Sequence, residues 1–318
     1  MNERASGRSP EWARLAPAVF VLLWSTGYVG ARFGLPFAEP LTLTALRFAI
    51  VVLLLSVLVL ITRRSISRDP RMWGHWIVTG VLIHTCFIGG IFFAIDRGVG
   101  IGIAALIAGV QPLLTAAAGS VLLGESLGTR QWTGFLVGFA GLSLVVAKGL
   151  TDGALPLAGL IGCCVGLLGI TFGTLYQKRY VVGTDLLAGS TVQFAAALVP
   201  CAIGSFLFES RVIEWNLTVV LVLAWLCIVM SIGAISILLF LIREGAASQV
   251  SSLFYLVPLV TAVQGVLLFD ESLSWVQWAG IAVTAIGVAM INIAPKTASG
   301  LRAPALHPVE VNDFRRVK

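Results

Sequence analysis

The sequence predicts an all-α membrane protein in which ten transmembrane helices form two five-helix repeats of inverted topology. Three observations carry this prediction: an apolar composition, ten long apolar runs, and an internal repeat at a fixed spacing. Of the 318 residues, 58% are hydrophobic and only 11% are charged, whereas a soluble domain has about 25% charged residues. A chain this apolar cannot cover a water-facing surface with polar groups, so the lipid bilayer is expected to be its main solvent.

Ten continuous apolar runs approach the roughly 20 residues that a helix needs to cross the hydrocarbon core. Because the runs are continuous and do not alternate, they favour helices over strands. The first run follows basic residues, as in a signal peptide, but it is long enough to span and no A-x-A cleavage site follows, so a retained helix is expected. The runs are Trp12–Gly34, Leu41–Thr62, Met72–Ile95, Val99–Leu123, Arg130–Ala147, Ala154–Tyr176, Asp185–Phe208, Leu217–Ile242, Ala246–Phe269 and Ser274–Ile293.

The two halves of the chain repeat each other at a constant offset of 146 residues. Residues Gln111–Leu127 and Val257–Leu273 are identical at nine of 17 positions, and further identities keep the same offset, such as Trp132 with Trp278. One five-helix unit has therefore been duplicated, giving a first repeat over 12–148 and a second over 154–294. Because five is odd, the second unit starts on the opposite side of the membrane, and the halves are expected to be inverted.

The basic residues predict the orientation. If both termini are cytoplasmic, the inner segments hold 16 Lys and Arg, the outer segments hold four, and Arg47 alone lies within a span. This asymmetry follows the positive-inside rule, and it explains the net charge of +6 without a nucleic-acid partner. Residues 1–11 are then a cytoplasmic segment, and residues 295–318 form a cytoplasmic tail whose polar composition predicts disorder.

Several motifs resemble the EamA-type transporters of the drug/metabolite transporter superfamily. They are the P-L-x-T-A…L-x-x-E-S-L ending of the fourth and ninth helices, WSTGYVGARFG at 24–34, and the Arg47-Phe48 pair. The resemblance covers about 12–293. The sixth helix departs from the family pattern because it carries Ile170-Thr171 where many members have a tryptophan.

The resemblance implies a function. It implies the export of small metabolites or drugs by alternating access. Because Trp24, Gln111 and Tyr255 would also suit an amphipathic molecule, we expect a secondary transporter of a bacterial-type inner membrane that exports a small organic metabolite, such as an amino acid or a related amphipathic compound. The resemblance also implies a central cavity lined largely by the first, third, fourth, sixth, eighth and ninth helices. A lipid- or drug-flippase-like carrier and a non-transporting membrane scaffold stay as alternatives, and a monomer or weak homo-oligomer is expected.

Arg47 is the only formal charge well inside a predicted span. Charged groups in the membrane usually face a cavity or a partner, so Arg47 is a candidate to hold a substrate carboxylate. The alternative is that it snorkels outward or bonds to helix-end carbonyls. Its repeat partner, Gln193, is also polar and is a second candidate.

Other candidates combine polarity with mid-membrane depth. Single Ser and Thr side chains usually bond back to their own helix, whereas aromatic and amide groups at this depth suit an amphipathic substrate, and His84 could titrate near neutral pH. The candidates for substrate binding or gating are Trp24, Thr26, Tyr28, Arg47, His84, Gln111, Thr171, Tyr176, Gln193 and Tyr255; Ser25, Ser231, Ser236, Ser251 and Gln264 lie at similar depth.

Prolines and glycines mark places where the helices are expected to bend or approach closely. Pro112 and Pro258 are repeat partners, and each removes a backbone N–H, so each is a candidate for a hinge, a cavity wall or a tolerated kink. Five glycines at alternating spacings of three and four form one stripe on the sixth helix: Gly159, Gly162, Gly166, Gly169 and Gly173. Such a stripe predicts either static close packing or a face along which one unit slides.

The acidic residues are expected at helix ends and not in the core. Glu125 and Glu271 end the fourth and ninth helices, where each carboxylate can accept N–H bonds from the first turn of the next helix. All 15 Asp and Glu residues lie at helix ends, in loops or in tails. Proton coupling through a buried acid is therefore disfavoured, and facilitated export or exchange is favoured.

The chain is not expected to be an enzyme, and no catalytic residue, metal site or cofactor is predicted. It has no H-E-x-x-H, G-x-S-x-G or P-loop motif and no paired mid-span acids. The five cysteines lie in apolar runs without CxxC spacing, as expected of small packing residues.

Overall fold

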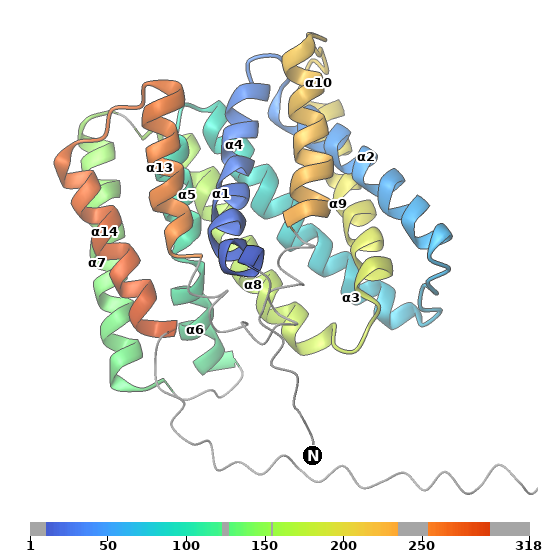
Figure 1. The fold of residues 1–318 in the computed structure, drawn as a ribbon, viewed down its shortest axis with the longest axis horizontal. Helices are drawn as coiled ribbons and strands as arrows, with labels where there is room; N and C mark the ends of the chain where they lie inside the picture. The colour runs from blue at the N-terminus through green and yellow to red at the C-terminus, as the bar shows by residue number, and fades with distance from the viewer. Residues whose placement is uncertain (1–10, 123–126, 154, 235–253, 293–318) are drawn as a thin grey trace, which may run out of the picture.

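The computed structural model describes residues 11–122, 127–153, 155–234 and 254–292, which form a bundle of helices (Figure 1). No strand occurs in these ranges, although one isolated antiparallel bridge joins Ala38 to Ile213. The all-α prediction is confirmed for the part of the chain that the structure describes. Parts of the predicted eighth and ninth runs, and the tail 295–318, lie outside it.

The helices follow the predicted runs closely. They are α1 (Glu11–Gly34), α2 (Pro40–Ile61), α3 (Pro70–Gly80), the π-helical η1 (Val81–Gly89), α4 (Gly90–Asp96), α5 (Ile101–Gly109), α6 (Gln111–Leu122), α7 (Thr129–Thr151), α8 (Leu157–Tyr180), α9 (Leu186–Phe208), α10 (Leu217–Ala224), the π-helical η2 (Trp225–Ala234), α13 (Leu256–Phe269) and α14 (Trp275–Asn292).

Six helical stretches of the described residues are long and apolar enough to cross a membrane. They are Pro40–Ile61, Pro70–Asp96, Ile101–Leu122, Thr129–Thr151, Leu157–Tyr180 and Leu186–Phe208. Three shorter apolar helices cover Leu217–Ser231, Leu256–Phe269 and Trp275–Ile291. The chain is therefore a helical membrane protein with six clear spans, and the count of ten stays a prediction.

Local chemistry explains where several helices begin. Asp69, Asp185 and Asn216 are N-cap residues whose side chains accept hydrogen bonds from Arg71 N, Ala188 N and Val219 N, and such caps satisfy backbone donors that have no partner within the helix. Pro40 and Pro70 occupy the first turns of α2 and α3, where a missing N–H costs nothing.

Helices at equivalent positions of the sequence repeat pack against one another. Contacts join α2 with α9, α5 with α13, and α7 with α14, and Figure 1 shows α7 beside α14 at one edge of the bundle. The α7–α14 pair is antiparallel, because Gly134 near the start of α7 meets Gly287 near the end of α14, whereas Gly141 meets Gly280. The offset of 146 makes Gly134 the repeat partner of Gly280, and Gly141 the repeat partner of Gly287. Replacing each residue of one contact by its repeat partner therefore gives the other contact, as a local two-fold relation requires.

The α7–α14 contact depends on the absence of side chains. A Cβ atom on Gly134 would lie 2.7 Å from the Gly287 carbonyl oxygen, and one on Gly141 would lie 2.7 Å from the Gly280 carbonyl oxygen. In lipid, helix association relies on such close packing, since there is no hydrophobic force between helices. These glycines hold α7 and α14 at backbone-contact distance.

The glycine stripe of α8 packs on η1 and α4. Cβ atoms on Gly162 and Gly90 would each lie within 2.8 Å of the other residue's carbonyl oxygen, and one on Gly169 would lie 2.7 Å from the Leu82 oxygen. All five stripe glycines are buried. The stripe therefore packs closely on the third predicted run of the first half, and its sliding role stays a prediction.

We expect Gly141→Ala to destabilise the protein, because the added methyl group would contact the backbone of α14, and overpacking of this kind costs about 1–3 kcal/mol. Gly74→Ala is the matched control, since no atom lies within 4 Å of the position of its Cβ and alanine favours a helix over glycine by about 1 kcal/mol. Thermal unfolding in detergent measures both. Equal melting temperatures for the two variants would contradict the packing argument.

Candidate functional site

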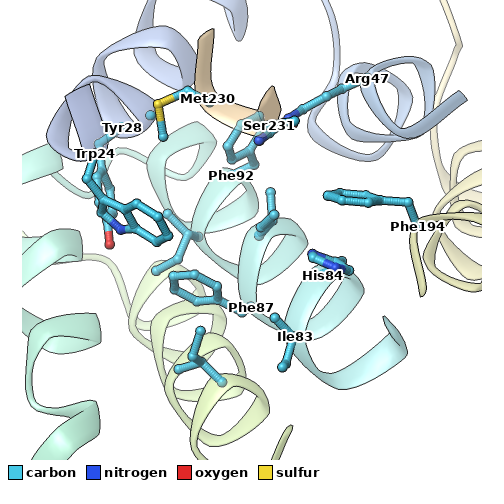
Figure 2. Close-up of a pocket in the computed structure, with 14 residues that line it drawn as sticks. Trp24, Tyr28, Arg47, Ile83, His84, Phe87, Phe92, Phe194, Met230 and Ser231 are labelled. Atoms are coloured by element: carbon cyan, nitrogen blue, oxygen red, sulfur yellow. The ribbon is translucent and has the colours of Figure 1, made fainter. Parts of the chain in front are cut away.

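A central cavity of about 190 Å³ lies between the two halves of the chain (Figure 2). Both halves contribute to its wall, because α1, α2, η1 and α4 come from the first repeat and α8, α9 and η2 from the second. The lining residues are Trp24, Gly27, Tyr28, Arg47, Ile83, His84, Phe87, Ile88, Ile91, Phe92, Ile170, Phe194, Met230 and Ser231. The wall is mostly apolar, with a few polar groups, as in small-molecule sites.

Arg47 extends from α2 toward the middle of this cavity (Figure 2). Its side chain is buried, with 7% of the residue exposed, and its Nε has no hydrogen-bond partner in the described structure. None of the ion pairs formed by the described residues includes Arg47. The side chain therefore faces the cavity, and whether Arg47 holds a substrate carboxylate stays a prediction.

His84 of η1 is held in the cavity wall by aromatic contacts. Its ring stacks on Phe194 with centroids 4.0 Å apart and an interplanar angle of 17°, and it meets Phe48 edge-on at 6.1 Å. Its Nδ1 is buried and has no hydrogen-bond partner in the described part of the chain. The imidazole is therefore fixed in position and keeps a free polar atom.

Two π-helical segments form much of the cavity wall. η1 supplies Ile83, His84, Phe87 and Ile88, and η2 supplies Met230 and Ser231. The segments occupy nearly equivalent places in the repeat, since Val81–Gly89 plus 146 gives 227–235. Ser231 Oγ donates to the Leu226 oxygen five residues back. A π-helix widens the turn and occurs often at functional sites, and here both widened turns face the same space.

A smaller cavity adjoins the first and shares Trp24, Tyr28, Phe87 and Ile170 with it. Its other lining residues are Ala105, Ala108, Gly109, Gln111, Pro112, Phe254, Val257 and Pro258. Gln111 donates to Thr115 Oγ1 at 2.9 Å. The structure thus brings Trp24, Tyr28, Arg47, His84, Gln111 and the two prolines to one connected region.

The helix is interrupted at Val110, between α5 and α6 and two residues before Pro112, as expected where proline removes a backbone donor. Pro258 lies in the first turn of α13, where the missing N–H has no partner within the helix in any case. The chain just before Phe254 lies outside the described residues, so a kink at Pro258 stays a prediction.

Five sequence candidates do not line either cavity. Thr26 and Thr171 donate to their own helices, at Leu23 O and Leu167 O, and Thr26 also accepts from Trp225 Nε1. Tyr176 hydrogen-bonds to His75 at 2.9 Å. Gln193 and Tyr255 are buried. Of the five, Thr26 and Tyr176 bond to side chains of other helices, while Ser231 does line the central cavity.

Carboxylates join the two halves at one end of the bundle. We call this the Glu39 end; it comprises Leu35–Glu39, Arg97–Gly100, Glu209–Asn216 and Asp270–Ser274 (Figure 1). The Glu209 carboxylate accepts from Leu41 N and Thr42 N at the start of α2, at 2.8 and 2.7 Å. The Glu39 carboxylate accepts from Ser210 N, Ser210 Oγ and Arg211 N beyond the end of α9.

The expectation that Glu271 bonds to the next helix is wrong. Its carboxylate instead accepts from Ile101 N at 2.7 Å and Gly102 N at 3.4 Å, in the first turn of α5 in the other half. The start of α14 is capped locally by Ser274 and Gln277, which bond to each other's backbone N–H groups. Glu125, the repeat partner of Glu271, lies outside the described residues.

No group of three or more His, Cys, Asp or Glu side chains that could hold a metal occurs among the described residues. The five cysteines are free thiols. The two cavities therefore offer apolar contact, a guanidinium and a few neutral polar groups.

The model of the EamA-like transporter family matches this chain twice, at residues 12–147 and 157–293. The chain belongs to the EamA-like transporter family. Among curated proteins, it is 27% identical over 279 residues to "Uncharacterized inner membrane transporter YedA" of Escherichia coli K12, covering 87% of this chain and 90% of that protein. The chain is accordingly a membrane transporter.

Other relatives agree with this assignment. "Uncharacterized transporter YvbV" of Bacillus subtilis is 25% identical, covering 88% of this chain and 91% of that protein. "Probable amino-acid metabolite efflux pump" of Escherichia coli K12 is 23% identical, covering 86% and 92%. One solved crystal structure matches with a TM-score of 0.60 and 22% identity, over 89% of this chain and 98% of that chain, which supports the fold.

The cavity of this EamA protein differs in part from the one that the family resemblance implies. The central cavity uses α2 and α9, which were not expected, through Arg47 and Phe194. The described residues of the fourth and ninth predicted helices line the smaller cavity and not the central one. Ile170, one of the two residues where the resemblance led us to expect a tryptophan, lies in the wall of both cavities.

Sequence reasoning missed the apolar wall, chiefly Phe87, Phe92, Phe194 and Met230. Apolar residues fill every span of this EamA protein, so hydrophobicity alone does not single out these four. The repeat contains a usable signal, however. His84 and Met230 are repeat partners that both line the cavity, as are Trp24 and Ile170.

We expect Glu39 to give this EamA protein a pH-dependent stability. The Ser210 hydroxyl above all, with the Ser210 and Arg211 N–H groups, lowers the pKa of Glu39 below its ordinary value of 4.5. A lowered folded-state pKa contributes stability that is present above 4.5 and lost as the pH falls through the folded-state value. The difference in melting temperature between wild type and Glu39→Gln should therefore shrink as the pH drops below 4.5. A difference that stays constant with pH would contradict the assignment.

Proposed function

We propose that this protein is a secondary transporter that exports a small organic metabolite, such as an amino acid or a related amphipathic compound, by alternating access. The observation that carries the proposal is the central cavity, which both halves line and into which the buried Arg47 points. An apolar cavity with few polar groups suits a small amphipathic ligand. The name of the relative "Probable amino-acid metabolite efflux pump" is consistent with this substrate class.

The proposed arrangement is ten spans in two inverted units, 12–148 and 154–294, with a cytoplasmic segment at 1–11 and a cytoplasmic tail at 295–318. The two family matches support the units, and the exchange of contacts between α7 and α14 supports a two-fold relation between them. The charge asymmetry favours both termini in the cytoplasm of a bacterial-type inner membrane. The unit of function is a monomer or a weak homo-oligomer.

The Glu39 end is the outer side in this topology. Glu39, Glu209 and Glu271 all join backbone groups of the opposite half there. Alternating access requires that one end of the cavity close while the other opens. These carboxylate contacts are the proposed closure on the outer side, and Glu125 is proposed for a related role on the inner side.

Binding of the substrate is proposed to involve Trp24, Tyr28, Arg47, His84 and Gln111, which line the connected cavities. Pro112 and Pro258 border the smaller cavity and are proposed to let their helices bend during the cycle. Thr26, Thr171, Tyr176, Gln193 and Tyr255 do not line the cavities and are proposed to position the residues that do.

Arg47→Ala should lower transport at least about tenfold, because a charge-assisted hydrogen bond contributes about 1.5–3 kcal/mol. Uptake of a metabolite panel into inside-out proteoliposomes, at varied pH gradients, measures this. Yield and melting temperature should stay close to wild type, since Arg47 has no partner to lose in the described structure. An alanine variant with full activity would remove Arg47 from the mechanism.

The topology predicts that the two ends of α7 lie on opposite sides of the membrane. Thr129 and Thr151 are both exposed and begin and end that helix, so they form a matched pair. In a chain whose five cysteines are replaced, Thr151→Cys should react with an impermeant thiol reagent on intact cells, and Thr129→Cys only after permeabilisation. The reverse pattern would refute the orientation, as would labels on the two termini that report different sides.

A further inference from the structure

The central cavity holds one formal charge without a counter-ion. Among the described residues that line the two cavities, Arg47 is the only charged side chain, and none is an Asp or Glu. The sequence predicts no mid-span acid, because every Asp and Glu of the chain falls at a predicted helix end, in a loop or in a tail. A bare guanidinium in a low-dielectric site attracts an anion and repels a cation.

Polar atoms without partners gather on the Arg47 side of the cavity. Arg47 Nε and His84 Nδ1 are both buried and unbonded within the described structure, whereas Ser231, on the same side (Figure 2), already donates its hydroxyl to the Leu226 oxygen. Stacking on Phe194 prevents the His84 ring from turning toward another partner. A guanidinium presents N–H groups in a planar fork that matches a carboxylate, and His84 can donate to a second acceptor of the same ligand when Nδ1 carries the proton.

The opposite side of the cavity is aromatic. Trp24 and Tyr28 of α1 lie across from Arg47, with Phe87 between them and His84 (Figure 2). Trp24 is held in place by edge contacts with Phe254 and by Phe20, at centroid distances of 5.2 and 5.3 Å. This side suits a compact apolar or aromatic body. At about 190 Å³ the cavity is smaller than the 300–1,000 Å³ typical of drug-sized ligands.

The described wall of this cavity holds no carboxylate that could bind the ammonium group of an amino acid. Aromatic faces attract cations, but an ammonium on the carbon next to a carboxylate bound at Arg47 would lie near the guanidinium and away from Trp24. No described group of the cavity wall therefore compensates the repulsion between this ammonium and the Arg47 guanidinium. A substrate with the same body and no ammonium keeps the attraction of Arg47 and avoids the repulsion.

We infer that the central cavity selects organic monocarboxylates with a compact apolar body, and discriminates against zwitterionic amino acids and amines of the same shape. The inference rests on the proposed transport function and narrows its substrate class. Arg47 and His84 receive the carboxylate, and Trp24, Tyr28 and Phe87 receive the apolar body.

Three compounds that share a phenylethyl body test the inference: 3-phenylpropanoate, phenylalanine and phenethylamine, which carry a negative, a zwitterionic and a positive head. Counterflow of labelled 3-phenylpropanoate into proteoliposomes of the full chain should exceed that of phenylalanine at least about tenfold, which corresponds to about 1.4 kcal/mol. Phenethylamine should be the weakest competitor. Arg47→Gln should reduce the preference for the anion to nearly one. Arg32→Gln, at an exposed arginine of α1 outside the cavity, should leave the preference unchanged.

The wild-type comparison stands even if Arg47→Gln does not fold. Counterflow of phenylalanine equal to or faster than that of 3-phenylpropanoate would overturn the inference and leave the proposed transport intact. If none of the three compounds moves while another member of the metabolite panel does, the inference is wrong and the transport function survives. If nothing in the panel moves beyond empty vesicles, the proposed function fails as well.

Discussion

Close contact between equivalent helices of the two halves is the constraint on which the rest of this structure depends. In a bilayer, apolar surface gains little by leaving lipid, so helices associate through close packing and hydrogen bonds. Here α7 meets α14 at glycines, and α5 meets α13 where Gly102 approaches Ala262 and Gly109 approaches Pro258. At the other edge, α2 pairs with α9.

These paired contacts leave the cavity between them. The helices of each half that carry the π-helical segments, together with α1 and α8, occupy the middle of the bundle, and their side chains face the gap. The glycine stripe of α8 fixes η1 and α4 against it, so the rings of His84 and Phe87 are presented from a rigid backbone. The position of the cavity thus follows from which helices of the two halves contact each other.

The sequence was informative wherever a pattern had one physical meaning. The long apolar runs, repeated at an offset of 146, predicted helices that match the described ones. The single mid-span charge drew attention to Arg47, which lines the central cavity. Glu271 was misassigned because its neighbours in sequence suggested α14, while the bundle brings the start of α5 to it. The π-helices were missed because apolar periodicity does not distinguish an i→i+5 turn inside a continuous apolar run. Phe194 and Met230 were missed because nothing local separates a cavity-facing apolar residue from a lipid-facing one.

The repeat relation between the two halves of the sequence does not extend to the chemistry of the cavity. Arg47 has Gln193 as its repeat partner, and only the arginine reaches the central space. A cargo held by its charged head is therefore tied to the first half of the molecule alone. In the proposed alternating-access cycle, the substrate would move together with α2, while the part of the cavity wall formed by the second half changes its position relative to the substrate. The substrate would then keep its contacts with the first half throughout the cycle, while its contacts with the second half change.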